Sequence, residues 1–338
     1  MNAGAAFVVQ DGPDVSAARR AASAMAAGAG LDETAAGRTA LVVTELGTNL
    51  LKHAGGGEIL LRRLDPAGGD DYAGVEILAL DNGPGLGDVD RSRRDGYSTT
   101  GTLGHGVGAI ERQSDWCQLH TDAAGTVILS HIRRERHPEA GFPSRLQIGG
   151  VRVNMPGERV CGDAWTARAR PGHLRVILAD GLGHGLAAQT AAQQAIDVFE
   201  ELDAGPLETL EAIHAALRAT RGAAVAIAAI DPDRGVVRYC GIGNIGGSIL
   251  APDGTQQKMV SMNGTAGHQL GRPREFQYPM PPRYILVMHS DGLSTKWDLA
   301  AHPGLRTRHP TLMAGVLYRA ARRRDDASVL VVKDRPSA

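Results

Sequence analysis

The amino-acid sequence predicts an α+β protein built from two domains. Its 338 residues are about twice the roughly 150 of a typical domain. The first half opens with two helical patterns followed by strands, whereas the second half opens with strands and returns to strands after its helices. Charged residues and prolines gather between the halves, at residues 133–145. We therefore expect domains over residues 1–135 and 148–335, joined by a linker at residues 136–147.

The first domain is expected to begin with two helices. Residues 14–30 are rich in alanine, with Asp14 or Ser16 as the N-cap. Asp32 is the expected cap of a second helix, whose apolar residues recur at helical spacing until the glycines 55–57. The elements expected after it are strands at 58–64 and 74–81, a glycine-rich loop at 82–108, a short helix at 109–114, and a hairpin of strands 117–121 and 126–132.

The second domain combines many strands with three helices. Helices are expected from Gly185 to about Leu202, over 206–220 and over 310–323. Alternating and β-branched patterns predict strands at 148–154, 160–169, 173–179, 223–230, 236–242, 247–251, 284–289 and 328–332. Runs of strands with helices grouped between them are typical of a layered α+β domain.

The composition limits which partners the protein could bind and in which cellular compartment it works. Lys and Arg number 36 against 37 for Asp and Glu, so the net charge of −1 provides no field for nucleic acid or an anionic membrane. The sequence has an odd number of cysteines: Cys117, Cys161 and Cys240. Because none of them forms a C-x-x-C pair, we expect all three to be core thiols in a reducing compartment. No run approaches the ~18 apolar residues of a membrane span. We expect a cytoplasmic protein that binds neither nucleic acid nor membrane.

Glu45 and Asn49 form the first candidate chemical pair. They are four residues apart on the second predicted helix, so they share one face. Glu45 could take or orient a proton while Asn49 offers an oxygen to Mg²⁺. Taken alone, such a pair is more often a solvated helix face.

Two glycine-containing segments follow this helix. Asp81, directly after a buried-looking strand, can accept a hydrogen bond from a base amino group, and Gly83 and Gly85 allow a ligand to approach the backbone. The backbone amides of the loop 101–108, which leads into a helix, suit phosphate. A glycine loop taken alone is more often an ordinary connection.

Together, TELGTNLLKHA, DNGPGL and GTLGHGVG resemble the three motifs of the GHKL (Bergerat) ATP-binding fold of gyrase, Hsp90, histidine kinases and MutL. GYSTTGTLGHGVGAIER looks most like the small anti-sigma-type, RsbT-like serine kinases. The resemblance implies an α/β sandwich that binds ATP with Mg²⁺, in which Glu45 is the general base, Asn49 holds Mg²⁺ and Asp81 reads adenine. The implied nucleotide cleft and its lid involve Gly83, Gly85, Thr99, Gly101, Gly104 and Gly106.

Aspartates at strand edges form the second candidate constellation. They are Asp163, Asp180, Asp291 and the pair Asp325 and Asp326. Each taken singly is more often a turn-former. An oxygen-only cluster suits Mg²⁺ or Mn²⁺, and two such ions could activate water for hydrolysis of a phosphate monoester.

The ordered motifs GDAW, DGLGHG, GIGN, SDGL and DDASVLVV look like those of the PPM-type serine/threonine phosphatases, in their SpoIIE branch and its compact RsbX-like form. The resemblance implies an α-β-β-α sandwich holding two Mn²⁺ or Mg²⁺ ions. Asp163 and Asp180 are the implied catalytic ligands, with Asp291, Asp325 and the Gly181 carbonyl completing the set. Asp326 is either a ligand of an additional ion or a support for the others, and His184 either orients water or is structural.

These resemblances predict a bifunctional switch protein. One half would phosphorylate, and the other dephosphorylate, serine or threonine of STAS-domain proteins in a stressosome or partner-switching pathway. A downstream output protein or sigma factor is a further expected partner. Two alternatives stay open: the first half could be a nucleotide-gated, non-catalytic, anti-sigma-like binding module, and the second a degenerate regulatory domain.

Overall fold

The computed structural model describes residues 4–66, 70, 72–86, 107–134, 146–170 and 172–334. These residues form two compact units, here called the N-terminal unit (to residue 134) and the C-terminal unit (from residue 146). Most of the linker expected at 136–147 lies outside the described residues, so the domain boundaries stay a prediction. No helix in the described ranges is long and apolar enough to cross a membrane.

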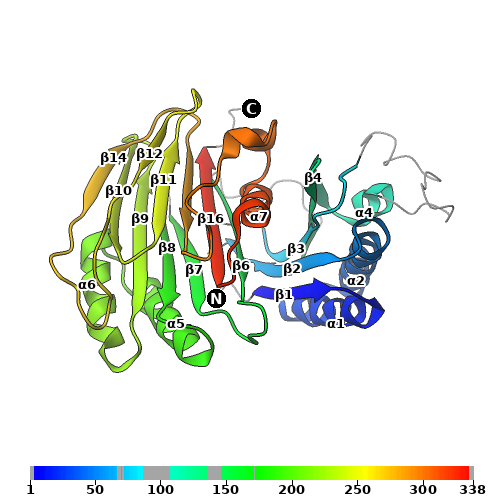
Figure 1. Cartoon of the computed structure of the whole chain (residues 1–338), viewed down its shortest axis with the longest axis horizontal. Coiled ribbons are helices and arrows are strands. Elements are labelled where there is room, and N and C mark those ends of the chain that lie inside the picture. Colours follow the sequence, from blue (N-terminus) through cyan, green and yellow to red (C-terminus); the bar gives the residue numbers. More distant parts are fainter. Residues whose placement is uncertain are drawn as a thin grey trace. The chain divides into compact units, whose positions relative to one another are not determined.

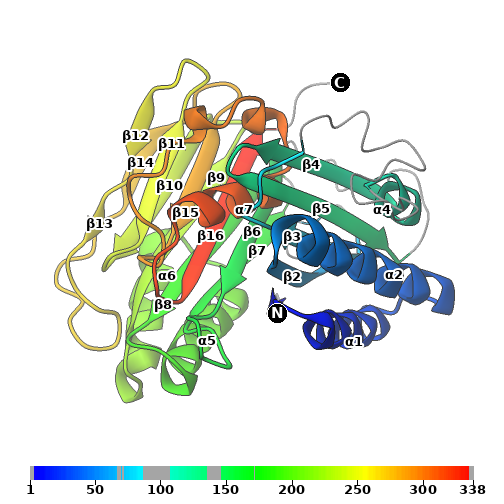
Figure 2. The same ribbon diagram turned by 45° about the vertical axis from the view of Figure 1, so that its right-hand side comes forward.

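The N-terminal unit is a five-stranded antiparallel sheet with its helices packed on one face (Figure 2). A shared apolar core of alanine, valine, leucine and isoleucine side chains joins the sheet to the helices. The strand order is β1 (Gly4–Val9), β2 (Gly57–Leu64), β3 (Gly74–Leu80), β5 (Gly125–Arg133) and β4 (Trp116–Asp122). The helices are α1 (Gly12–Gly28), α2 (Glu33–Asn49), which continues as the π-helical turn η1 (Leu50–Ala54), and α4 (Val107–Gln113).

The start of α1 differs from the sequence prediction. The helix is capped by Asp11 rather than by Asp14 or Ser16, because the Asp11 side chain accepts from the Asp14 N–H and the Asp14 carboxylate accepts from the Asp11 N–H. This reciprocal capping box lets Pro13 occupy the first turn, where its missing N–H has no consequence. The cap predicted for α2 is confirmed, since Asp32 Oδ1 accepts from the Ala35 N–H at 2.7 Å.

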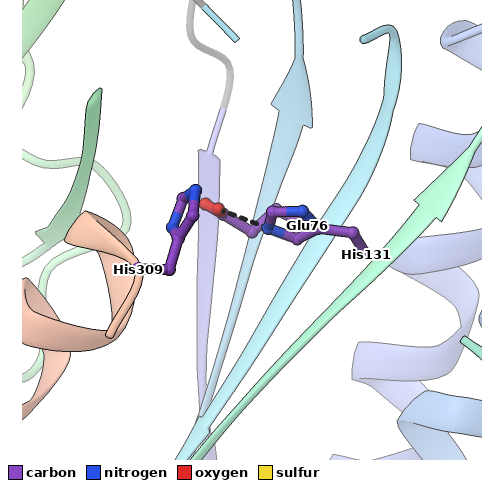
Figure 3. A group of neighbouring side chains, drawn as sticks. All are labelled: Glu76, His131 and His309. Atoms are coloured by element: carbon purple, nitrogen blue, oxygen red, sulfur yellow. Dashed lines mark hydrogen bonds and ion pairs between the residues drawn. The ribbon is translucent and has the colours of Figure 1, made fainter. Parts of the chain in front are cut away.

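A buried polar network ties β2, β3 and β5 together. Arg62 donates to Glu76 at 2.7 Å and binds both carboxylate oxygens of Asp70. Figure 3 shows the His131 ring directed at Glu76, with Nε2 2.9 Å from Oε2. Burial opposes ionisation of Glu76, but Arg62 and then His131 outweigh it and lower its pKa. The network therefore holds a carboxylate in its charged form inside the protein.

The C-terminal unit consists of two sheets stacked face to face, with helices on both outer faces (Figure 1). The space between the sheets is filled by large side chains such as Trp165, Tyr239 and Tyr284. Helices α5 (Leu186–Glu201) and α6 (Pro206–Ala216) cover one sheet, and α7 (Pro310–Ala321) covers the other. This arrangement confirms the predicted α-β-β-α sandwich.

The first sheet of this unit has the order β13 (Ser261–Met262), β10 (Val236–Ile242), β9 (Ala223–Asp231), β8 (His173–Gly181) and β7 (Asp163–Arg170), with β14 (Phe276–Pro279) also paired to β10. The second has the order β12 (Gln256–Lys258), β11 (Gly246–Leu250), β15 (Ile285–His289), β16 (Ala327–Asp334) and β6 (Leu146–Val153). The strand predicted at 160–169 starts later, at Asp163.

The cysteine prediction holds for two of the three thiols. Cys161 and Cys240 are buried, and burial raises the pKa of Cys240 to about 12. Cys117, on β4, is only partly buried, although it packs against the apolar core of the N-terminal unit.

Candidate functional site

The first candidate site lies at the end of α2 in the N-terminal unit. Glu45 and Asn49 are both partly buried and stand one turn apart. The chain then passes through η1 to Ala54, and a Cβ added at Gly83 would lie 2.9 Å from the Ala54 Cβ. Two of the sequence motifs, separated by a whole strand pair, therefore meet in space.

Asp81 anchors the loop that follows β3. Its Oδ1 accepts hydrogen bonds from the N–H groups of Gly83 at 2.8 Å and Thr126 at 3.0 Å. Gly85 has φ of +74°, and a Cβ there would overlap the Asp122 carbonyl oxygen. Both glycines are thus required by close packing of this loop, whatever ligand it binds.

The third nucleotide motif is only partly visible. The predicted residues Thr99, Gly101, Gly104 and Gly106 lie outside the described residues. The helix that follows them, α4, packs against α2 with Val107 and Ile110 buried. The end of the third motif is therefore fixed beside the helix that carries Glu45.

The second candidate site lies at one edge of the C-terminal unit, where both sheets contribute. Asp163 and Asp180 face each other in the register of β7 and β8. Ser290, just after β15, donates its hydroxyl to Asp163 Oδ2 at 2.6 Å and accepts from the Ser328 N–H of β16 at 2.9 Å. This buried serine couples the two sheets beside the predicted metal ligands.

The remaining predicted aspartates converge on the same edge. Asp326 accepts from the N–H groups of Met155 at 2.7 Å and Gly162 at 2.9 Å, so both of its oxygens hold the connection between β6 and β7. Asp291 Oδ2 accepts from the Asn244 side-chain amide at 2.6 Å. These contacts give Asp326 a structural role and fix the orientation of Asp291.

Burial, followed by mutual repulsion, raises the pKa values of the aspartates in this cluster. Burial, followed by Asp163, Asp291, Asp325 and Asp326, raises the pKa of Asp180 to about 9. Burial, together with repulsion by Asp326 and Asp291, also raises the pKa of Asp163 to about 7, although the Ser290 hydrogen bond opposes the shift. Burial and Asp325 raise the pKa of Asp291. Crowded carboxylates that resist ionisation are the environment in which a divalent cation is strongly stabilising.

The atoms of the cluster fit such a cation. Asp163 Oδ1 is buried and has no hydrogen-bond partner in the described part of the chain, so it retains an oxygen for a ligand. Among the described residues, no three of these carboxylates place oxygen atoms within 4.8 Å of one another. Each ion would therefore take further ligands from backbone oxygen or water, as Mg²⁺ and Mn²⁺ commonly do.

The glycine-rich turn after Asp180 is packed tightly. A Cβ at Gly181 would overlap the Ala188 carbonyl oxygen of α5, and the Gly181 N–H donates to the Gly162 carbonyl at 3.1 Å. His184 is exposed, and its Nδ1 lies 2.6 Å from Oε1 of Glu158. The structure thus gives His184 a partner that the sequence did not indicate.

The folds and sites of the two units define two classes of protein in one chain: a histidine kinase-like ATPase domain followed by a PP2C-type phosphatase domain. Family comparisons agree. Residues 10–130 match the family model of the histidine kinase-like ATPase domain, and residues 170–334 match that of stage II sporulation protein E (SpoIIE). The N-terminal unit belongs to the histidine kinase-like ATPase family, and most of the C-terminal unit matches the SpoIIE family model.

Comparison with individual proteins gives more specific similarities than the family models do. The N-terminal half is 33% identical to the serine/threonine-protein kinase RsbT of Bacillus subtilis (strain 168) over 116 residues, covering 34% of this chain and 85% of RsbT. The C-terminal half is 26% identical to the phosphoserine phosphatase RsbX of the same strain over 163 residues, covering 46% of this chain and 79% of RsbX.

Solved structures also match. One, described as "The bacterial stressosome: a modular system that has been adapted to control secondary messenger signaling", is 26% identical with a TM-score of 0.51, covering 56% of this chain and all of that one. RsbX has been crystallised in complex with magnesium; that structure is 22% identical with a TM-score of 0.49, covering 56% of this chain and 94% of its own.

Sequence reasoning missed three residues of the second site. Ser290 precedes a predicted ligand in SDGL, and Asn244 ends the motif GIGN, to which we assigned no ligand. Glu158 carried no signal at all. The position of Ser290 directly before Asp291, at the end of an apolar strand, is the feature that could have indicated it.

Proposed function

We propose that the chain is a bifunctional switch protein. The N-terminal unit would transfer phosphate from ATP to serine or threonine of a STAS-domain partner, and the C-terminal unit would remove it. Similarity to a serine/threonine kinase in one half and to a phosphoserine phosphatase in the other supports opposing activities. Fusion would keep the two domains at high effective concentration around one partner.

The phosphatase proposal depends above all on the convergence of aspartates from four separate segments at one edge. Asp163, Asp180, Asp291 and Asp325, with the Gly181 carbonyl, would hold two Mg²⁺ or Mn²⁺ ions. Such ions supply a water of lowered pKa and neutralise charge on a phosphoryl oxygen.

Three other side chains prepare this site. Ser290 keeps one oxygen of Asp163 in a fixed direction and leaves the other available. Asn244 orients Asp291 in the same way. Asp326 holds the segment that leads into β7, and β7 begins at Asp163.

Hydrolysis of p-nitrophenyl phosphate tests the phosphatase. We expect Mn²⁺-dependent turnover that is lost in Asp180→Asn and Asp291→Asn but retained in Asp233→Asn, which removes the same charge from an exposed turn. Turnover that needs no metal, or that survives both site variants, would contradict the metal assignment and favour the degenerate regulatory domain.

For the kinase, the resemblance assigns Glu45 as the base for the acceptor hydroxyl, Asn49 as the Mg²⁺ ligand and Asp81 as the residue that reads adenine. The approach of Ala54 to Gly83 supports one common nucleotide site. A carboxylate can act as a base only where it reaches the acceptor proton, and the partial exposure of Glu45 leaves it accessible.

Labelled ATP, Mg²⁺ and a purified STAS-domain protein test this assignment. Glu45→Gln should abolish transfer while leaving ATP binding intact, whereas Glu33→Gln, an exposed change on the same helix, should do neither. Undetectable transfer by the natural chain, with ATP bound and Glu45→Gln without effect on partner binding, would favour the nucleotide-gated binding module instead.

A further inference from the structure

The segment that follows Asp180 presents two leucines to solvent. Leu182 is 54% exposed and Leu186 is 70% exposed, although most large apolar side chains of this unit are buried. They are separated only by Gly183, the exposed His184 and Gly185. Two exposed leucines so close together, immediately beside a proposed catalytic carboxylate, form an apolar edge that folding does not require.

This edge, residues 182–186, is held in place by hydrogen bonds on both sides. The Leu182 N–H donates to the Gly222 carbonyl at 3.0 Å, and the Gln189 N–H donates to the Gly185 carbonyl at 3.0 Å. In the middle, His184 is paired with Glu158. The leucines therefore project from a preorganised backbone, and a ligand that covers them need not order the loop first.

A cation accompanies the leucines. A Cβ at Gly183 would meet Nη1 of Arg221 at 3.1 Å, so this guanidinium lies against the same edge. Arg221 is exposed, and the Gly222 carbonyl that binds Leu182 is on the next residue. An apolar pair with an arginine beside it is complementary to a segment that carries both apolar side chains and a phosphate.

We propose that residues 182–186 are the docking edge for the substrate protein, and that they select phosphoserine or phosphothreonine flanked by apolar side chains. This inference rests on the proposed phosphatase activity. When the phosphoryl group of a substrate protein reaches Asp180, the substrate residues that flank it pass Leu182 and Leu186. These leucines lie two and six residues beyond Asp180 in the chain. Selectivity for proteins over small phosphate esters would come from this edge rather than from the aspartates.

Two phosphoserine peptides test the proposal without knowledge of the natural partner. They are identical except that the residues flanking phosphoserine are leucine in one and serine in the other. We expect kcat/KM to favour the leucine peptide by about tenfold, the effect of partly burying one or two leucine side chains. In Leu182→Ser/Leu186→Ser this preference should disappear, while turnover of p-nitrophenyl phosphate stays within about twofold of the natural rate.

Val260→Ser is the matched control, because Val260 is 46% exposed in the same unit but belongs to the connection between β12 and β13. It should retain the leucine preference. Both leucine substitutions are at exposed positions, so thermal unfolding should be close to that of the natural protein.

Distinct results would overturn the proposal. Equal kcat/KM for the two peptides, or a preference that persists in the double variant, would exclude docking at this edge. Parallel loss of p-nitrophenyl phosphate turnover would show that the leucines support the catalytic centre. A change of oligomeric state in sedimentation would identify a second copy as the occupant. A natural protein that does not hydrolyse p-nitrophenyl phosphate at all would instead refute the proposed function.

Discussion

Replacing Asp180 by asparagine should stabilise the metal-free protein even though it destroys the proposed catalytic site. Burial and four neighbouring aspartates raise the pKa of Asp180 to about 9 in the folded state, compared with 3.8 for an ordinary aspartate. The folded state therefore binds a proton that the unfolded state has released. Compared with a side chain that stays neutral, Asp180 therefore leaves the stability of the folded state unchanged below about pH 4 and lowers it progressively as pH rises towards 9.

The size of the effect follows from the same values. At pH 7, about three pH units above the ordinary pKa, the unfavourable contribution is at most roughly 4 kcal/mol. Because the neighbouring aspartates share the repulsion, we expect Asp180→Asn to recover about half of it, roughly 2 kcal/mol. For a unit of this size, that corresponds to a rise in Tm of about 4 to 8 °C.

Differential scanning calorimetry in EDTA, from pH 5 to pH 8, measures this directly. The gap between Asp180→Asn and the natural protein should widen as pH rises, whereas Asp233→Asn should show no such gap. With Mn²⁺ the order should reverse, because only the intact carboxylate gains from the ion. An Asp180→Asn protein that melts below the natural one in EDTA at pH 7 would refute the repulsion argument.

Three further substitutions test individual contacts. Ser290→Ala removes the hydroxyl bound to Asp163, so stability should fall by about 1 to 2 kcal/mol and half-saturation by Mn²⁺ should need more metal, as read from a Mn²⁺ titration of turnover. Glu76→Gln removes one of the carboxylates that pair with the buried Arg62 guanidinium, so the free energy of unfolding measured in urea should fall by about 3 kcal/mol. An unchanged midpoint of urea unfolding would contradict the ion network. Gly85→Ala forces a side chain into a left-handed, crowded position and should cost at least ~2 kcal/mol by the same assay, whereas Gly37→Ala, in an open helical position, should be neutral or slightly stabilising.

Local sequence signals predicted most of the regular elements. Asp32 was identified as a helix cap because its signal lies within one turn of the residue it binds. The long apolar strands of the C-terminal unit were also found, since each carries its own pattern. Strands of two to four residues, such as β12 and β13, were missed because their pairing partners, rather than their own residues, make them strands.

The candidate sites show the same division. The aspartates could be proposed because each stands at the end of a strand with glycine or another acid beside it. The bond from Ser290 to Asp163 spans 127 residues of sequence, and no local pattern in one sequence specifies such a contact. The same holds for Asn244, which reaches Asp291 across 47 residues. The sequence thus indicated the proposed ligands, and the fold added the groups that orient them.

The role of Asp326 bears on the order in which the protein is made. The turn before β7 depends on this carboxylate, which the ribosome adds more than 160 residues after the turn itself. The described strands of the N-terminal unit, by contrast, pair with one another, and the last of them ends at Arg133. At ~5 to 20 residues per second, translation would leave about 10 to 40 s in which a nascent chain has a finished first unit and an unfinished second one. Under the proposed function, a nascent chain would therefore complete the unit proposed to add phosphate before it completes the unit proposed to remove it.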